Sequence, residues 1–322
     1  MIINWLEAHA RDLSTAIDEG RRAHAYLISG ARGTGKRALA HWFARRVLGG
    51  GSEPVAADVP PPVHPDFLSV TPEPDKTGLS IEQIRALIAE FTLTSHQGGA
   101  RVAVLEPADS MSRNAANSLL KTLEEPSGDS LIILVADRLQ YLPATVLSRC
   151  IHVKVRRPRR ETAQAWLSGH DPDVDWPYAL ALAHNGPLLA LALAHNGELE
   201  QAGGFADDFE RLLAGAADPV AVAAAWHKAA PAFALRWLVT TVDGLIRWRM
   251  TGQADPWARP RWENTAARRI DLKNLFCYQD GLLRYINRPR GTYNELLALE
   301  SLLIAWHRRL EAPATGIFQL TA

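Results

Sequence analysis

The sequence predicts an α/β module built on a parallel sheet, followed by all-helical segments. Three observations predict this fold. Short apolar strands alternate with amphipathic helices up to about residue 157, a pattern typical of a parallel sheet covered on both faces. A glycine-rich stretch, GARGTGK at 30–36, lies between one such strand and the following helix. Beyond residue 158 the apolar residues recur at helical spacing, and no run is typical of a strand.

The elements of the α/β module follow from apolar periodicity and from helix-start signals such as Ser80. The expected order is a helix over 1–20, a strand over 25–29, a helix over 36–48, a strand over 66–70, a helix over 80–91, a strand over 101–106, a helix over 112–126 and a strand over 130–136. The Gly- and Pro-rich stretch 49–62 is predicted to be a surface loop, and the alternation stops near 148–160. Residues 161–200 are typical of a small helical unit, and residues from 201 onward of a further helical domain.

Composition narrows the class of protein. The 322 residues include 35 Lys plus Arg and 35 Asp plus Glu, so no overall positive charge predicts a nucleic-acid partner. Any contact with DNA is therefore local or shared with other chains. The two cysteines, Cys150 and Cys277, give neither a disulfide framework nor a metal-ligand spacing. No stretch has the pattern of a signal peptide or a membrane span, so we expect a soluble cytoplasmic protein without a membrane partner.

The stretch 30–37 matches a phosphate-binding loop except at its last position. Such a loop cradles phosphates with backbone N–H groups, reaches them with a Lys, and holds Mg²⁺ with a Ser or Thr. Here Arg37 replaces the Ser or Thr, and a guanidinium group cannot ligate a metal ion. The candidate binding residues are Gly30, Gly33, Thr34, Gly35, Lys36 and Arg37. Binding of nucleotide, phosphate or sulfate without turnover stays open.

A second catalytic element is also altered. A hydrolytic site normally has an apolar strand that ends in Asp-Glu, where the Asp orders the metal ion and the Glu polarises water. Here the strand RVAVL ends in Glu106 and Pro107, and Pro107 has neither a base nor an N–H. We therefore expect no intrinsic ATP hydrolysis.

Two further motifs identify a resemblance. NSLLKTLEEP at 117–126 and Ser-Arg-Cys at 148–150 closely resemble the clamp-loader branch of the AAA+ ATPases. HAYLISG at 24–30, HPDF at 64–67 and NELLALESLL at 294–303 are also similar to that branch, so the resemblance covers essentially the whole chain.

The resemblance implies a domain plan and a set of roles. The plan is an AAA+ nucleotide-binding-type domain at 1–157, a helical lid at 158–200 and a helical collar at 201–322 through which five subunits form a ring. It also implies a non-hydrolysing stator subunit that places Arg149 in trans on the γ-phosphate of a neighbouring ATPase subunit. Ala136 and Leu188 then stand where ATPase members carry polar sensor residues, and neither side chain donates a hydrogen bond.

The implied partners belong to the bacterial DNA polymerase III holoenzyme. They are the gamma or tau ATPase subunits, the clamp-opening delta subunit and, through the complex, the beta sliding clamp and primed DNA. An active gamma-like loader ATPase and a nucleotide-binding scaffold outside replication remain as alternatives.

Several residues carry expectations without a catalytic role. Many family members hold a structural zinc ion with four cysteines before His64, and this chain has none there, so we predict no metal. His24, His41 and His64 are expected to pack or cap, and Cys150 is expected to be a buried small residue. The tryptophans beyond 201 are expected to form core. The basic run 154–160 is either a solvated hinge face or a contact to template phosphates, and 284–297 is either a collar contact or a surface loop.

Overall fold

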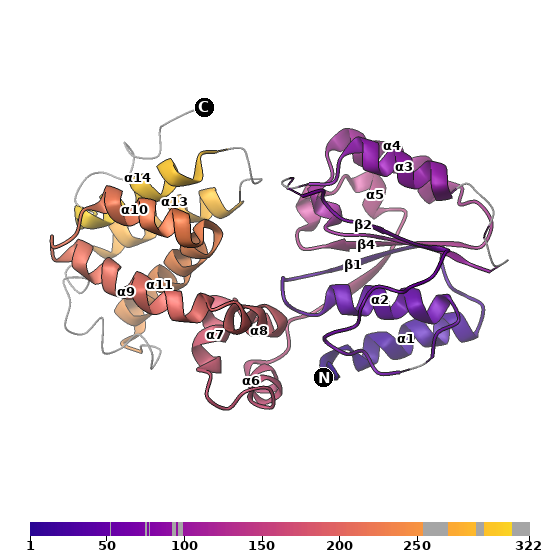
Figure 1. The fold of residues 1–322 in the computed structure, drawn as a ribbon, viewed down its shortest axis with the longest axis horizontal. Helices are drawn as coiled ribbons and strands as arrows, with labels where there is room; N and C mark the ends of the chain where they lie inside the picture. The colour runs from indigo at the N-terminus through magenta and orange to yellow at the C-terminus, as the bar shows by residue number, and fades with distance from the viewer. Residues whose placement is uncertain are drawn as a thin grey trace. The chain divides into compact units, whose positions relative to one another are not determined.

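The chain folds into two compact units, drawn in Figure 1. The computed structural model describes residues 1–51, 53–74, 76, 78–91, 95, 99–253, 270–287 and 293–310. The first unit comprises Met1–Ala165 with Asn185–Leu189, and the second comprises the rest, from Trp166 to His184 and beyond Ala190. The three-part division at 1–157, 158–200 and 201–322 stays a prediction. Residues 288–292, within the open stretch 284–297, lie outside the described residues.

The first unit alternates helices and strands as the sequence predicts. Its elements are η1 (Asn4–Leu6), α1 (Glu7–Asp18), β1 (Ala25–Gly30), α2 (Lys36–Val47), β2 (Phe67–Val70), α3 (Ile81–Phe91), β3 (Arg101–Leu105), η2 (Ala108–Ser110), α4 (Arg113–Glu124), β4 (Ser130–Ala136), η3 (Leu139–Tyr141), α5 (Ala144–Leu147) and β5 (Ile151–Val155). Ser80 caps α3 as expected, because its Oγ accepts from the Gln83 N–H while the Gln83 side chain accepts from the Ser80 N–H.

The five strands form one parallel sheet in the order β2-β3-β4-β1-β5. The register pairs Leu105 of β3 with Leu134 of β4, and Ser29 of β1 with Ala136 of β4. The loops that follow β1, β3 and β4 therefore leave the sheet at the same edge. This edge is where open parallel sheets place their ligand sites.

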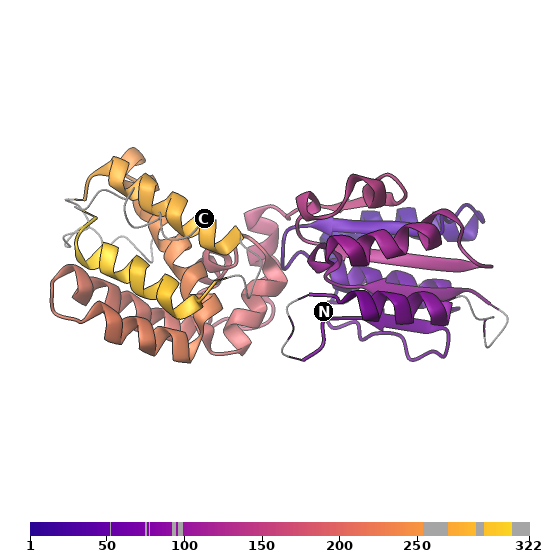
Figure 2. The same cartoon turned by 90° about the horizontal axis from the view of Figure 1, so that it is seen from above.

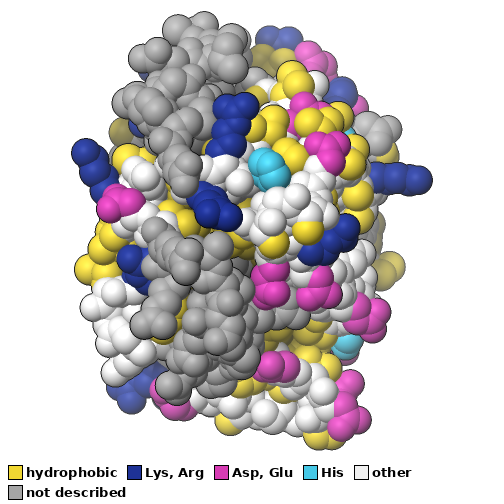
Figure 3. Space-filling view, turned by 90° about the vertical axis from the view of Figure 1, so that its left-hand side faces the viewer, with side chains coloured by type: hydrophobic (Ala, Val, Ile, Leu, Met, Phe, Trp, Pro, Cys, Tyr) yellow, Lys and Arg dark blue, Asp and Glu magenta, His cyan; other side chains and the backbone are white. Residues whose placement is uncertain are grey.

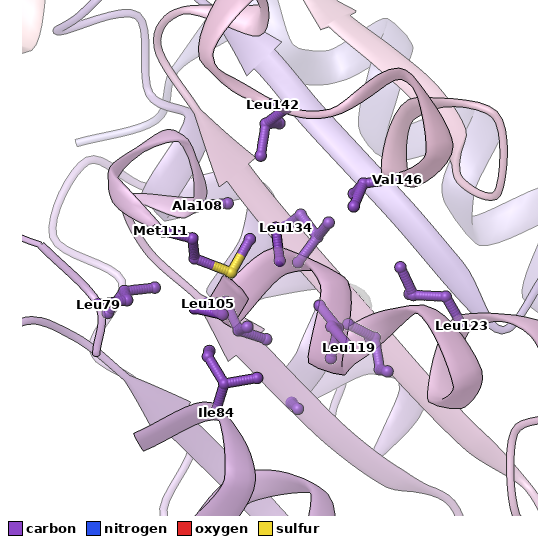
Figure 4. Close-up of a cluster of buried hydrophobic side chains, with 14 of the residues drawn as sticks. Leu79, Ile84, Leu105, Ala108, Met111, Leu119, Leu123, Leu134, Leu142 and Val146 are labelled. Carbon is purple, nitrogen blue, oxygen red and sulfur yellow. The ribbon is translucent and has the colours of Figure 1, made fainter. Parts of the chain in front are cut away.

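Helices cover both faces of the sheet, with α1 and α2 on one side and α3, α4 and α5 on the other (Figure 1). The second side holds a buried hydrophobic cluster in which Leu105, Leu119 and Leu134 are fully buried (Figure 4). Leu123 of α4 and Val146 of α5 point into the same cluster. The core therefore fixes the ends of α4 and α5 against the sheet.

The second unit is all-helical, as the sequence predicts. Its helices are α7 (Trp176–Leu182), α9 (Glu198–Leu213), α10 (Pro219–Ala229), α11 (Pro231–Thr251), α13 (Leu272–Asn287) and α14 (Glu295–His307). Two further helices, α6 (Arg160–Ser168) and α8 (Pro187–His195), each run from the first unit into the second. Figure 2 shows the helices from α9 onward packed side by side.

Tryptophans contribute to the core of the second unit, which confirms that expectation for three of the four described ones beyond residue 201, while Trp248 is only partly buried. Trp226, Trp237 and Trp306 are buried, and Phe209 stacks on Trp306 with ring centroids 3.9 Å apart. The described side chains visible in Figure 3 mix acidic, basic and hydrophobic types on one end of this unit. Among the described side chains of that face, charges of both signs are therefore interspersed.

Two features of the first unit are known only from the structure: the strand β5 and the contacts that hold the loop after α2. The strand β5 was not predicted, and it pairs with β1 at the edge of the sheet. The loop after α2 is held by hydrogen bonds from Trp42 to the Glu53 carbonyl at 2.6 Å and from Arg45 to the Pro60 carbonyl at 2.9 Å. The Ile3 N–H also donates to the Val55 carbonyl at 2.8 Å. Contacts within the chain thus secure this loop.

Neither a metal cluster nor a single membrane-spanning helix is found among the described residues. No group of three or more His, Cys, Asp or Glu side chains has metal-binding geometry within that part of the chain. No single described helix is long and apolar enough to cross a membrane, although two sharply bent helix pairs meet the criterion of length and composition together.

Candidate functional site

The predicted phosphate-binding loop connects β1 to α2, the context that this motif requires. Gly33 and Gly35 both have positive φ, +73° and +93°, which side-chain-bearing residues rarely adopt. The Thr34 hydroxyl donates to the Ala31 carbonyl at 2.9 Å, so it closes the loop on itself. Thr34 is buried and its own carbonyl accepts from the Trp5 indole N–H at 2.9 Å. The loop backbone is therefore fixed by contacts within the chain.

Lys36 is buried and already has two protein partners. Its side chain is 5% exposed, and its ammonium group lies 2.7 Å from Asp137 Oδ1 and 2.6 Å from the Ala31 carbonyl oxygen. Arg32 approaches the other oxygen of Asp137 at 3.6 Å. The cation that would reach a terminal phosphate in an ATPase is thus engaged by a carboxylate of this chain.

Arg37 and Glu106 meet in one ion pair, with Nε 2.7 Å from Oε2. Glu106 comes directly after β3 and is 17% exposed, while Arg37 lies in the first turn of α2 and is 67% exposed. In P-loop ATPases the corresponding Ser/Thr and acidic residue hold Mg²⁺ between them. Here a fixed guanidinium cation occupies that relation to the carboxylate, so these residues do not fit a magnesium ion.

The loop after β4 is tied to the segment after β3. Ala136 is buried at the end of β4, and Asp137 follows it. The carboxylate of Asp109, in η2, accepts from the backbone N–H groups of Asp137 and Arg138, each at 3.1 Å. These bonds fix the backbone from which Asp137 reaches Lys36.

The segment Asn185–Leu189, which belongs to the first unit, covers the phosphate-binding loop. The Leu188 N–H donates to the Gly33 carbonyl at 2.9 Å. A Cβ at Gly33 would lie 2.6 Å from both the Cβ and the N of Leu189, so only glycine fits there. The backbone of Leu188 binds the loop, and its side chain has no group that donates to a phosphate.

Arg149 lies just after α5, and its side chain is 31% exposed. It pairs with Glu124, the last residue of α4, and donates to the Thr145 carbonyl at 2.8 Å.

Cys150 is only half-buried, whereas the sequence predicted a fully buried residue. Burial raises the pKa of the Cys150 thiol to about 11, which leaves it protonated and unreactive near neutral pH.

The three histidines, His24, His41 and His64, make local hydrogen bonds, as expected for packing or capping residues. His24 Nε2 lies 2.8 Å from the Leu123 carbonyl oxygen, and His64 Nδ1 accepts from the Asp66 N–H at 3.1 Å. Burial of His41 lowers the pKa of its imidazole, an effect that a hydrogen bond to the Val59 carbonyl partly opposes.

Three carboxylates of the site were missed by the sequence reasoning: Asp109, Asp137 and Glu124. Asp137 directly follows a buried strand, which is a usable signal because the carboxyl ends of parallel strands share one edge. Asp109 and Glu124 occupy a short turn and a helix end, where such residues are common for local reasons.

The fold and the loop between β1 and α2 together define an AAA+-type P-loop module in which Arg37 pairs with Glu106. A family model described as DNA polymerase III, delta subunit, matches residues 5–159. The DNA polymerase III subunit delta' of Pseudomonas aeruginosa is 30% identical over 305 residues, which cover 89% of this chain and 92% of that protein. The chain belongs to the family of delta' subunits of DNA polymerase III, the clamp-loader component.

Two further proteins are similar to this chain over different lengths. The delta' subunit of Bacillus subtilis is 38% identical over 165 residues, which cover 47% of this chain and 49% of that protein. A crystal structure of a DNA polymerase III gamma subunit-related protein from Thermotoga maritima has a TM-score of 0.48 and 16% identity, over 93% of this chain and 99% of that one.

Proposed function

We propose that this chain acts in its clamp loader as a stator that does not hydrolyse ATP, and that it completes the ATPase site of a neighbouring subunit with Arg149. The observation that carries the first half is the ion pair between Arg37 and Glu106. A cation beside the carboxylate opposes Mg²⁺ by charge and uses the oxygen that the metal ion would need. Without Mg²⁺ the β- and γ-phosphates lose their main charge neutralisation.

The pairing of Lys36 with Asp137 supports the same conclusion. A γ-phosphate would have to displace this carboxylate from a largely buried ammonium group. The loop can still present backbone N–H groups to an anion, so we propose phosphate or nucleotide as a weak ligand without turnover.

The partial exposure of Arg149 supports the proposal that it completes the ATPase site of a neighbouring subunit. The guanidinium group is planar, always charged and forked, which suits a γ-phosphate oxygen at a subunit interface. In other nucleotidases an arginine finger accelerates hydrolysis by about 10³ to 10⁵. Arg149 is the residue of this chain that we assign to that role.

The assembly follows from the family. We propose that the chain works in the cytoplasm, joins gamma or tau and delta in the loader, and through that complex acts on the beta clamp and primed DNA. The basic run 154–160 lies partly on β5, and its exposed Arg156 and Arg157 fit either a hinge face or a phosphate contact.

The test is ATP hydrolysis by the purified chain and by a loader reconstituted from gamma, delta and this chain, with clamp and primed DNA. The chain alone is expected to be inactive. In single-turnover hydrolysis, Arg149→Ala should slow the site next to this chain by about 10³-fold while assembly is retained. Arg85→Ala, which removes an exposed arginine from α3, is the matched control. Turnover by the isolated chain would refute the stator assignment, and an unchanged rate for Arg149→Ala would refute the trans role.

A further inference from the structure

Glu124 holds one edge of the Arg149 guanidinium group. Nε of Arg149 lies 2.7 Å from Glu124 Oε1, and Nη2 donates to the same oxygen. Nε and Nη2 form the side edge of the planar group, so a single carboxylate engages that whole edge. The orientation of the fork is therefore set by Glu124.

The backbone of α5 holds a second part of the group. Nη1 donates to the Thr145 carbonyl at 2.8 Å and lies 3.4 Å from the Ser148 hydroxyl oxygen. A guanidinium group has five N–H donors, and one Nη2 donor has no acceptor among the described residues. This donor lies on the end edge shared with Nη1, which diverges from the edge that Glu124 engages.

Both ends of the contact are anchored in the core. Glu124 ends α4, which begins at the Ser112 cap and buries Leu119 and Leu123. Arg149 follows α5, whose Val146 is buried in the same cluster as Leu123 (Figure 4). Two packed helix ends thus determine the separation of the carboxylate and the guanidinium group.

We propose that Glu124 is a positioning residue that holds Arg149 ready for the γ-phosphate of the neighbouring subunit. This inference rests on the trans role of Arg149 proposed above. A free arginine side chain loses rotamer freedom when it enters a site, and ordering one such side chain weakens the interaction by about two- to tenfold. An arginine already held by Glu124 has lost that freedom before the subunits meet.

The opposite effect, competition between Glu124 and the phosphate, arises only if the phosphate has to displace Glu124. Glu124 is 48% exposed and Arg149 is 31% exposed, so water screens the pair. An exposed pair of this kind shifts an equilibrium by at most about fivefold. A γ-phosphate carries more charge than a carboxylate, and the end edge still has one Nη2 donor for it, so it does not need to displace Glu124.

The experiment is single-turnover ATP hydrolysis by the reconstituted loader containing Glu124→Gln or Glu124→Ala. The hydrolysis rate of the site next to this chain should fall by about two- to tenfold, more for Ala than for Gln because the amide oxygen still accepts one hydrogen bond. The ATP concentration at half-maximal rate and loader assembly should not change. Glu125→Gln removes the same charge from the neighbouring exposed residue and should match the wild type.

The double variants decide between positioning and a general structural effect. In an Arg149→Ala background, Glu124→Gln should have no further effect, because it acts through that arginine. An equal loss in both backgrounds would overturn the proposal. A normal or faster rate for Glu124→Gln, with Arg149→Ala still slow, would overturn the positioning role alone. If Arg149→Ala is itself silent, the trans role fails as well.

Discussion

Replacement of Asp137 by Asn tests whether the chain itself satisfies the phosphate-binding loop. The substitution keeps the size of the side chain and removes its charge. Lys36 would then keep only neutral acceptors, the amide oxygen at position 137 and the Ala31 carbonyl, although its side chain is 5% exposed. An ammonium group left buried without a counter-charge destabilises the folded state.

The magnitude follows from the geometry. At 2.7 Å and an effective dielectric constant of about 20, the two charges attract by about 6 kcal/mol, most of which the desolvation of both groups offsets. Removal of one partner from a buried pair costs about 3–5 kcal/mol. Asp137 is 30% exposed and water reaches its side of the pair, so we expect a loss of about 2–3 kcal/mol in the free energy of unfolding. For a unit of this size the melting temperature should fall by about 5–10 °C.

The assay is thermal melting with and without inorganic phosphate. Phosphate should stabilise Asp137→Asn by about 2.7 kcal/mol at a hundredfold excess over its dissociation constant, because the anion replaces the lost carboxylate. Asp12→Asn, an exposed carboxylate on α1, controls for net charge and should melt like the wild type in both buffers. Adding Lys36→Met to Asp137→Asn should restore most of the stability. The reasoning is wrong if Asp137→Asn melts at the same temperature as the wild type, or if phosphate stabilises Asp137→Asn and the wild type equally.

Three further substitutions test the surroundings of the site. Gly33→Ala should lower the free energy of unfolding by at least about 2 kcal/mol, since the new Cβ meets Leu189 at 2.6 Å, whereas Gly20→Ala, with a similar φ of +65° and open space, should cost only about 1 kcal/mol; chemical denaturation measures both. Leu119→Ala, at a fully buried position, should cost about 2–5 kcal/mol against less than about 0.5 for the exposed Leu297→Ala in the same assay. The pKa of His41 is lowered in the folded state, so the unfolded chain binds the proton more readily and stability should fall as pH drops below about 6.5; His41→Gln should lack that part of the dependence when melting is compared at pH 7.5 and 5.0, and an equal slope would contradict this.

The sheet was predictable wherever its strands are buried on both faces. The strands β1, β3 and β4 read as apolar runs, because helices cover them on both sides. The edge strand β5 was missed, since Ile151 and His152 are exposed and the strand lies within a basic stretch. Its pairing with β1 is a tertiary contact, and no local pattern specifies it.

The sequence alone identified the residues that depart from the phosphate-binding motif, but it did not predict which residues contact one another. Arg37 and Glu106 were each identified as substitutions, yet they are 69 residues apart in sequence, and only the strand order brings them to the same sheet edge. Asp137 lies beside Ala136, but an Asp after a strand is equally typical of a turn. The partner of a buried charge is set by tertiary geometry, which a single sequence does not contain.

The replacements in the site act together, and this bears on the proposed stator role. An ATPase site leaves its Lys and its acidic residue available, so that nucleotide and Mg²⁺ supply the missing partners and binding drives a conformational change. Here Lys36 has Asp137 and Arg37 has Glu106, so a nucleotide would gain little from either cation. Under the proposed stator role, such a site has no large difference in free energy between a loaded and an unloaded state, and it would not switch with ATP. A subunit that does not switch is a fixed reference against which neighbouring subunits move, and Arg149, held by Glu124 in the same compact unit, keeps its place relative to that reference.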